Sequence, residues 1–141
     1  MTAAERPVHL RGRSIVLVFA GGTIGTGLRY GLSRLVPPWA GVPVAVLGIN
    51  VLGAFVLGLL LESLPRAGSD DGWRRDLRLG VGTGVLGGFT TYSALATDTA
   101  TLLAGGHPAY GVGYATGTLV LGLLAAALGI WSAGHRQGTL P

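Results

Sequence analysis

Long stretches without charged residues alternate with short polar segments along this 141-residue chain. Four such stretches cover residues 14–28, 35–61, 79–97 and 99–134. The first continues across Arg29 to about residue 36, and the last contains a turn signal, Gly-Gly-His-Pro, at residues 105–108. We expect the first to be a span rather than a signal peptide, since no small-residue cleavage site follows it. A spanning helix needs about 20 mostly apolar residues, so the pattern predicts four transmembrane helices, over about 14–36, 42–63, 77–103 and 108–132.

The third predicted span is poorly built as a plain apolar helix. Its middle, residues 87–93, reads Gly-Gly-Phe-Thr-Thr-Tyr-Ser. Two adjacent glycines and a group of hydroxyl side chains at that depth predict a helix that is broken at its centre. In hydrocarbon, irregular backbone persists only where it is buried in protein or lines a polar cavity or an ion site. We therefore expect residues 87–93 to be the working part of the chain.

The composition favours an all-α, polytopic membrane protein over a soluble domain. Only 11% of the residues are charged, and 26 are glycine. We expect a single four-helix domain over residues 1–141. The absence of cysteine excludes disulfides and thiolate sites. No carboxylate pair or histidine cluster lies within a predicted span, so transport or conduction is favoured over an enzyme. The net charge of +4 does not indicate nucleic-acid binding, because the arginines lie at the predicted membrane boundaries.

All ten basic residues are arginines, and their distribution predicts how the chain inserts into the cell membrane. With four spans, both ends and the polar connection over residues 65–76 lie on one side. The opposite side can claim only Arg34 and Arg29. By the positive-inside rule both ends are predicted to be cytoplasmic, and this bias argues against insertion in both orientations. The arginines on the predicted cytoplasmic side are Arg6, Arg11, Arg13, Arg66, Arg74, Arg75, Arg78 and Arg136.

Glycines recur at four-residue spacing in several spans, which places small residues on one helix face and allows close contact between helices. Four short helices enclose little by themselves, so we also expect an oligomer. The repeated sets are Gly21/Gly25, Gly27/Gly31, Gly80/Gly84/Gly88 and Gly113/Gly117.

Two polar side chains inside the first and second spans each allow a structural and a functional interpretation. Asn50 lies near the centre of the second span, where it can bridge helices or donate its NH₂ group to an anion. Being neutral, it can bind an anion without trapping it. Arg29 lies about one turn from the end of the first span, where it can reach the headgroups or raise the local anion concentration at a pore mouth.

The fourth span carries Tyr110, Tyr114 and Thr118 at successive four-residue steps, which predicts a polar stripe along one helix face. Tyr110 can be an interfacial anchor, whereas the hydroxyls of Tyr114 and Thr118 lie deeper and need partners or face an ionic pathway. Asp98 is the one acid in the long apolar region, close to the end of the third span, where we expect it to reach the interface.

Three of these segments in order resemble the Fluc (CrcB) family of fluoride channels. They are residues 21–30, with Gly21-Gly22, Gly25 and Arg29-Tyr30; residues 48–53, with Gly48, Asn50 and Gly53; and residues 87–93. The resemblance extends from about residue 16 to about residue 130, and it includes the number and length of the helices.

The resemblance implies a passive, fluoride-selective channel that lets cytoplasmic fluoride leak out, built as an antiparallel dimer with two pores in lipid. It also implies a structural sodium ion at the centre of the dimer, bound by the backbone carbonyls of Gly87 and Thr90, which as hard oxygen ligands suit such an ion. Asn50 would be a donor in the pore and Arg29 a charge at its entrance. The remaining residues implied along the pore are Ser93, Tyr114 and Thr118.

The chain departs from the family at two phenylalanines, three residues apart, whose positive ring edges face the anion. The corresponding residues are Tyr92 and Leu95. Tyrosine keeps a polarised edge, but leucine offers nothing to an anion, so a pore lined by Leu95 should conduct poorly or share the work with another subunit. Antiparallel homodimers also need a balanced arginine distribution, which this chain lacks. We therefore predict one half of a heterodimer with an oppositely oriented four-helix relative.

Two alternatives stay open from the sequence. A small multidrug-resistance-type, proton-coupled transporter also has four short helices, but it needs a membrane-embedded carboxylate, usually in the first span, where this chain has none. A non-conducting assembly subunit is favoured if Leu95 closes the pore.

Overall fold

The computed structural model describes residues 11–135, and this part of the chain is built from helices. No strand occurs among these residues; Trp39 and Val42 form one isolated bridge in the connection between the first two helices. In chain order the elements are α1 (Gly12–Leu35), α2 (Val44–Arg66), α3 (Gly72–Leu77), the π-helix η2 (Arg78–Leu86), α4 (Gly87–Phe89), α5 (Tyr92–Ala104) and α6 (Pro108–His135). The predicted all-helical architecture is thus confirmed for the described residues, whereas the dimer stays a prediction.

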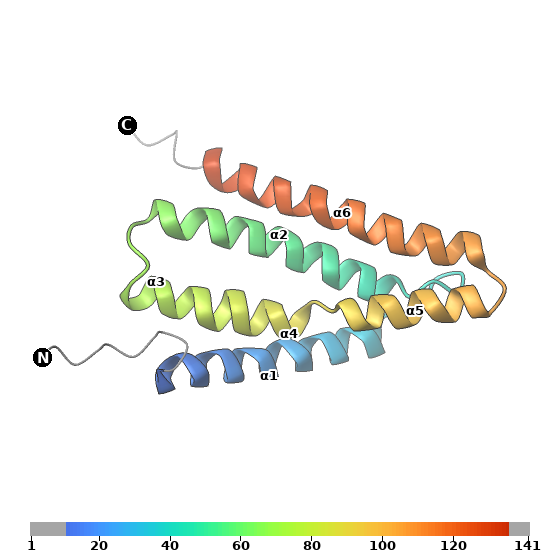
Figure 1. Cartoon of the computed structure of the whole chain (residues 1–141), viewed down its shortest axis with the longest axis horizontal. Coiled ribbons are helices and arrows are strands. Elements are labelled where there is room, and N and C mark those ends of the chain that lie inside the picture. The colour runs from blue at the N-terminus through green and yellow to red at the C-terminus, as the bar shows by residue number, and fades with distance from the viewer. Residues whose placement is uncertain (1–10, 136–141) are drawn as a thin grey trace, which may run out of the picture.

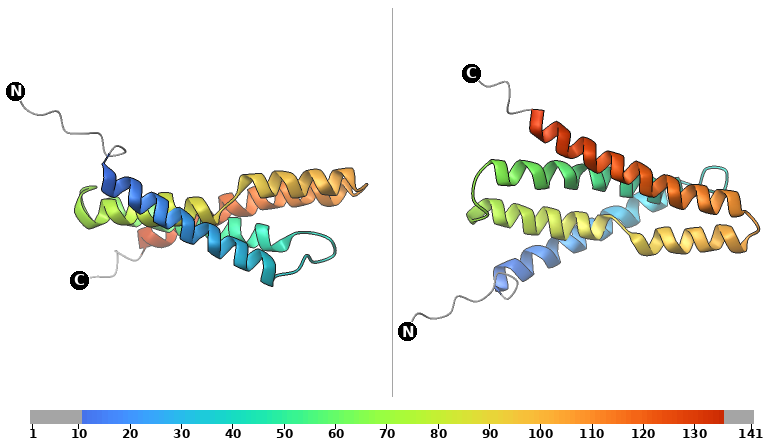
Figure 2. Two further views of the ribbon diagram at one scale, coloured as in Figure 1. Left: turned by 90° about the horizontal axis from the view of Figure 1, so that it is seen from below. Right: turned by 45° about the horizontal axis from the view of Figure 1, so that its top comes forward.

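The helices lie roughly side by side along the long axis of the molecule (Figure 1). α2 packs along α6, α1 packs on η2 and α4, and α5 packs on α6. The run from α3 to α5 therefore changes neighbours along its length: its first half contacts α1 and its second half contacts α6. Figure 2 shows from two further directions that α5 is offset from the line of α4. This offset marks the interruption of the third span.

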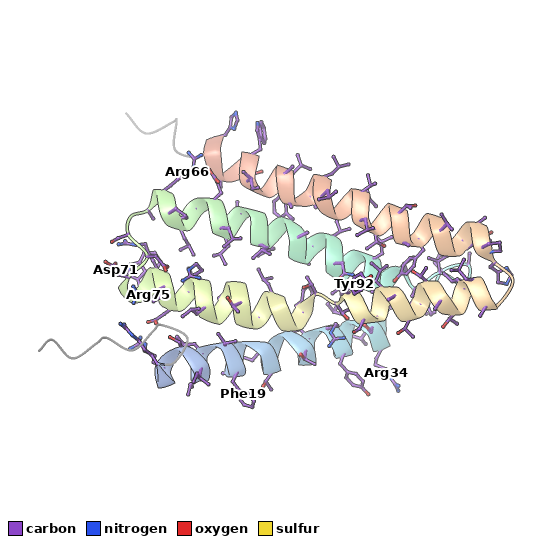
Figure 3. The ribbon with its side chains drawn as sticks, viewed as in Figure 1. Phe19, Arg34, Arg66, Asp71, Arg75 and Tyr92 are labelled. Atoms are coloured by element: carbon purple, nitrogen blue, oxygen red, sulfur yellow. The ribbon has the colours of Figure 1, made fainter. Side chains whose placement is uncertain are left out.

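Among residues 11–135, three helices are long and apolar enough to cross a membrane by length and composition: α1, α2 and α6. The remaining predicted span, over about 77–103, is divided among the shorter pieces from α3 to α5. The start of α1, the α2–α3 connection and the end of α6 lie at the same end of the bundle (Figure 1). Figure 3 shows Arg66, Asp71 and Arg75 at that end and Arg34 toward the other. The chain is accordingly a membrane protein with three continuous apolar helices and one interrupted one.

The polar connection predicted over residues 65–76 is shorter in the structure, because helices extend into it from both sides. α2 continues through Pro65 to Arg66, and α3 begins at Gly72. Arg66 pairs with Glu62 one turn earlier, which supports the last turn of α2. Proline near a helix end sacrifices one backbone hydrogen bond but does not stop the helix when such contacts hold the turn. Only residues 67–71 are left between the two helices.

The glycine faces predicted to allow close packing divide into two groups. Gly21 and Gly25 do press α1 against the third span: a Cβ atom at Gly25 would overlap the Val85 carbonyl oxygen and lie 2.8 Å from the Phe89 nitrogen. A Cβ at Gly88 would overlap the Gly22 carbonyl oxygen. By contrast, no atom lies within 4 Å of a Cβ placed at Gly27, Gly31, Gly113 or Gly117. At these four positions a side chain would meet open space within the described part of the chain.

Two further glycines, which the four-residue spacing did not single out, join α2 to α6. A Cβ at Gly58 would overlap the Ala126 carbonyl oxygen, and a Cβ at Gly129 would overlap the Phe55 carbonyl oxygen. The two helices therefore cross with their backbones in contact. Because each helix contributes a single glycine to the crossing, no repeat within one helix could reveal it.

Ion pairs connect elements at the end of the bundle that holds the α2–α3 connection. Arg13 of α1 pairs with Asp76 of α3, and Arg78 donates to both carboxylate oxygens of Asp70 at 3.0 and 2.7 Å. The hydrogen bond from Arg78 lowers the pKa of Asp70. The stabilisation from a lowered carboxyl pKa is present above the pKa of the unfolded chain and is lost as the pH falls through the lowered pKa. It is small here, since the pair is exposed to solvent.

α5 and α6 are joined by a polar contact between Asp98 and Tyr114. The Tyr114 hydroxyl donates to Asp98 Oδ2 at 3.2 Å, and the tyrosine is only 3% exposed. One turn later the Thr118 hydroxyl donates to the Tyr114 carbonyl oxygen at 2.7 Å, and Thr118 is also 3% exposed. The predicted polar stripe of the fourth span thus faces α5 at Tyr114, whereas Tyr110 is exposed.

The packing of α1 predicts opposite effects for two alanine substitutions on the same helix. Gly25→Ala should lower stability by about 1–3 kcal/mol, because its methyl group overlaps the backbone of η2. Gly27→Ala, the matched control, has open space and should leave stability unchanged or raise it by up to about 1 kcal/mol, since alanine favours the helix. Thermal unfolding in detergent measures both. Equal unfolding temperatures for the two variants would contradict the close approach of α1.

The contact between α5 and α6 predicts an energetic coupling between its two side chains. In a double-mutant cycle, Tyr114→Phe and Asp98→Ala should couple by about 1 kcal/mol or more, because each substitution removes the same hydrogen bond. The exposed Tyr110 provides the control: Tyr110→Phe and Asp98→Ala should be additive. Additivity in the Tyr114 cycle would show that the hydrogen bond contributes nothing to stability.

Candidate functional site at the helix break

The third span is interrupted at two threonines. Thr90 and Thr91 lie between α4 and α5, and both have extended backbone, with φ, ψ of −76°, 156° and −152°, 121°. The chain leaves the helix after Phe89 and starts a new one at Tyr92. The break therefore falls within residues 87–93, as predicted.

The two glycines that suggested the break are themselves helical, which corrects the expectation that they form its irregular part. Gly87 and Gly88 begin α4, and Gly88 permits the close approach to Gly22 of α1. The hydroxyl groups stop and restart the helix instead. Thr90 donates its hydroxyl and its N–H to the Leu86 carbonyl, at 2.8 and 2.9 Å. Thr91 caps α5 by accepting the Ala94 N–H at 3.2 Å.

Asn50 of α2 pairs with the backbone of Thr91 in both directions. The Thr91 N–H donates to Asn50 Oδ1 at 2.8 Å, and Asn50 Nδ2 donates to the Thr91 carbonyl oxygen at 3.0 Å. The structural interpretation of Asn50, a bridge between helices, is thus realised at the break. An amide NH₂ carries two hydrogens, so one N–H of Asn50 is left for another acceptor.

Arg29 of α1 reaches the break from the opposite side. Its Nε donates to the Gly88 carbonyl oxygen at 3.2 Å, and the guanidinium is half-buried. The Thr26 hydroxyl lies 3.4 Å from the same oxygen. The Gly88 carbonyl is one of the last in α4, where the helix dipole is negative, and a cation there is electrostatically favourable. Arg29 thus contacts the break itself.

A groove of about 650 Å³ opens along one side of the break, between α2, η2, α5 and α6. Its walls are mostly apolar and carry a few polar groups at the depth of the break. Of the predicted site residues, the groove brings together Asn50, Gly87, Thr90, Tyr92, Leu95 and Thr118.

The residues at the groove differ in how much of their side-chain surface the described chain covers. Tyr92, labelled in Figure 3 at the start of α5, is 79% exposed, whereas Leu95 is 6% exposed. Ser93 is exposed, and its hydroxyl lies 3.1 Å from that of Thr91. Three predicted site residues, Arg29, Ser93 and Tyr114, are not part of the lining.

Backbone carbonyls are freed at the break. The Thr91 N–H, which would bond the Gly87 carbonyl in a continuous helix, is taken by Asn50. In the described part of the chain no hydrogen bond reaches the carbonyl of Gly87 or of Thr90. Gly87 is exposed, with nothing within 4 Å of a Cβ placed there. The site can therefore offer N–H donors to an anion and carbonyl oxygens to a cation.

The sequence did not predict the contacts that several residues at or near this site make. Thr91 lies in the segment predicted to be the working part but has no predicted role, the sequence predicts no role for Thr26, and Asp98 is predicted to reach the interface. The need of the Tyr114 hydroxyl for a partner and the position of Asp98 as the one acid in the long apolar region were the available signal for their hydrogen bond. For Thr91 no signal existed, because its contact uses backbone atoms that any residue has.

Comparison with known proteins places the chain in a family. The model of the family described as "CrcB-like protein, Camphor Resistance (CrcB)" matches residues 16–130. A protein of Leifsonia xyli named fluoride-specific ion channel FluC 2 is 54% identical over 124 residues, which cover 88% of this chain and 86% of that protein.

Two further relatives carry the same kind of name. Fluoride-specific ion channel FluC 1 of Cutibacterium acnes is 47% identical over 111 residues, 78% of each chain. Fluoride-specific ion channel FluC of Thermus thermophilus is 46% identical over 125 residues, 87% of this chain and 97% of that protein. These relatives are named as ion channels, which groups the chain with channels rather than with enzymes. With most of its length matched by the family model and 54% identity to one of these channels over the 124 aligned residues, the chain belongs to the CrcB-like family.

Proposed function

We propose that the chain is a subunit of a fluoride-selective channel that lowers cytoplasmic fluoride by passive efflux across the cell membrane. The names of the relatives support fluoride as the ion. The observation that carries the proposal is the half-buried Asn50 at the helix break, which lines the groove and keeps one N–H for an acceptor.

The chemistry of the groove suits a small, strongly hydrated anion. Entry into a narrow pore replaces water by protein donors, and donors in a water-poor site are stronger than in bulk water. Asn50 supplies an N–H without a positive charge, so the anion can also leave. The exposed Tyr92 supplies a polarised ring edge and a hydroxyl at the edge of the same groove. Arg29 is close enough to the break to favour anions electrostatically.

The unpaired carbonyls of Gly87 and Thr90 fit a structural sodium ion. Both belong to the groove side of the break, and both are without a hydrogen bond in the described part of the chain. Backbone oxygens are the ligands that hard cations prefer. Two carbonyls are too few to hold the ion, so a second subunit would complete the set. When bound, sodium would offset the negative charge at the C-terminal end of α4. Asn50 and Arg29 of this chain would hold the backbone around it.

We infer a heterodimer with an oppositely oriented four-helix relative from two independent features. Leu95 stands at the second phenylalanine position, is buried, and lines the groove, so this chain gives its pore an unequal set of residues. Figure 3 shows Arg66 and Arg75 at one end of the bundle and Arg34 toward the other. Arg13 pairs with Asp76 of α3, whereas Arg29 lies beside the helix break. Arg6 and Arg136 lie outside the described residues. The bias supports a single orientation, with both ends of the chain in the cytoplasm.

Reconstitution into liposomes tests the channel and the heterodimer together. The chain alone should give little fluoride efflux, and the chain with a partner of opposite arginine bias that keeps both phenylalanines should give rapid efflux. Full efflux from the chain alone would defeat the heterodimer. If neither preparation shows efflux, the chain is a non-conducting assembly subunit instead of a channel subunit. If efflux requires a proton gradient, the chain is a proton-coupled transporter.

The same assay tests Leu95 in the mixed dimer. Leu95→Phe should raise the fluoride efflux rate by roughly a few-fold, because phenylalanine offers the anion a positive ring edge and leucine offers none. Leu128 is exposed and outside the groove lining, so Leu128→Phe is the control and should change nothing. An unchanged rate for Leu95→Phe would remove Leu95 from the ion path.

The sodium proposal predicts a cation dependence of stability. Replacing sodium by choline should lower the unfolding temperature of the reconstituted dimer, because an ion that binds only the folded state stabilises it by about 2.7 kcal/mol at a hundredfold excess over its Kd. The dependence should be absent in separated single subunits, which lack half of the ligands. An unfolding temperature indifferent to sodium in the dimer would contradict the site.

A further inference from the structure

The pairing of Asn50 with Thr91 depends on the extended conformation of one residue. At φ −152° and ψ 121°, the N–H and the carbonyl of Thr91 point to the same side of the chain. A primary amide presents its oxygen and its NH₂ group side by side in one plane. The two hydrogen bonds, of 2.8 and 3.0 Å, therefore close a ring in which Asn50 replaces the neighbouring strand that Thr91 lacks.

The reach of this short side chain is set by α2 itself. Gly53 lies three residues after Asn50, and a Cβ atom at Gly53 would overlap the Thr90 methyl group. The absence of a side chain at Gly53 thus lets α2 approach the break closely enough for Asn50 to meet Thr91. Serine and aspartate cannot reproduce the pairing at neutral pH, because serine has one polar atom and an ionised aspartate has no hydrogen to donate.

The pairing also fixes where the second hydrogen of Asn50 points. One hydrogen of Nδ2 is held by the Thr91 carbonyl, and the amide group is planar, so the direction of the other hydrogen is determined by the same ring. Asn50 and Thr91 both line the groove. Free rotation of the amide would otherwise let its oxygen face the groove and repel an anion.

We propose that Asn50 is the positioning residue of the helix break, and that its pairing with Thr91 aims its remaining N–H into the groove. The break and the groove donor are then a single unit, and neither keeps its geometry without the other. The first half of this proposal is independent of transport; the second half rests on the proposed function.

Asn50 is the only asparagine of the chain, which allows a direct test on the unmodified protein. In the full-length chain labelled with ¹⁵N-asparagine, the side chain gives one pair of NH₂ resonances. One proton should exchange slowly with solvent, because it is bound to Thr91, and the other faster. Adding fluoride to the assembled channel should shift the faster proton more than chloride does. Two protons with equal exchange rates would overturn the pairing.

Substitutions separate the positioning role from the donor role. Asn50→Leu should raise the exchange rate of the Thr91 amide about tenfold or more, since a hydrogen bond is lost, and should abolish fluoride efflux. In Asn50→Asp a carboxyl oxygen can still accept the Thr91 N–H. When the carboxyl group is protonated, its single O–H can donate to the Thr91 carbonyl, so no hydrogen is left to point into the groove. The Thr91 amide of Asn50→Asp should therefore stay protected from exchange. Its fluoride efflux rate should not exceed that of protein-free vesicles, at neutral pH or in acid. Leu52→Ala, an exposed site on α2 outside the groove lining, is the control for both measurements.

Each outcome decides one half of the proposal. Unchanged protection of Thr91 in Asn50→Leu would overturn the positioning role; if that variant does not fold, the NH₂ exchange rates of the unmodified chain decide instead. Restored efflux in acidified Asn50→Asp would overturn the aimed donor. If the unmodified chain conducts no fluoride with or without a partner, the proposed function fails, while the exchange measurements still decide the pairing.

Discussion

The backbone at the centre of the third span needs partners, and the rest of the structure depends on how they are provided. Unpaired N–H and carbonyl groups are expensive at membrane depth. Here α2 provides Asn50 for Thr91, and α1 provides Arg29 and Thr26 for the Gly88 carbonyl. Both helices reach the break because glycines remove the side chains that would hold them away. The broken helix is therefore held from two sides by contacts within the chain itself.

Much of the fold follows from the sequence because membrane depth imposes simple rules. The apolar runs predicted the spans, and hydroxyls beside glycines predicted an interruption between residues 87 and 93. The exact residues of the break could not be predicted, since glycine serves irregular backbone and close packing equally well. Gly88 packs against Gly22 and stays helical. The crossing of α2 and α6 at Gly58 and Gly129 was also hidden, because it pairs single glycines on different helices.

The site was only partly predictable for a related reason. Asn50 stands out as an amide in an apolar span, but its partner is the backbone of Thr91, which carries no signature in the side-chain pattern. Asp98 and Tyr114 are visible separately, and only the packing of α5 on α6 brings them together. Leu95 shows the converse: its departure from the family was visible at once, and the structure adds that it is buried beside the groove.

The π-helix η2 determines the direction in which the residues after it face. Over residues 78–86 the backbone follows π-helical rather than α-helical geometry, which accommodates more residues in each turn. If η2 wound as an α-helix of the same length, everything downstream would rotate, because an α-helix turns by about 100° per residue and a π-helix, with i→i+5 hydrogen bonds, turns by less. Thr91 would then turn away from Asn50, even though no residue of the site had changed. The way η2 winds therefore sets the direction in which Thr91 faces, so its π-helical geometry is itself part of the site.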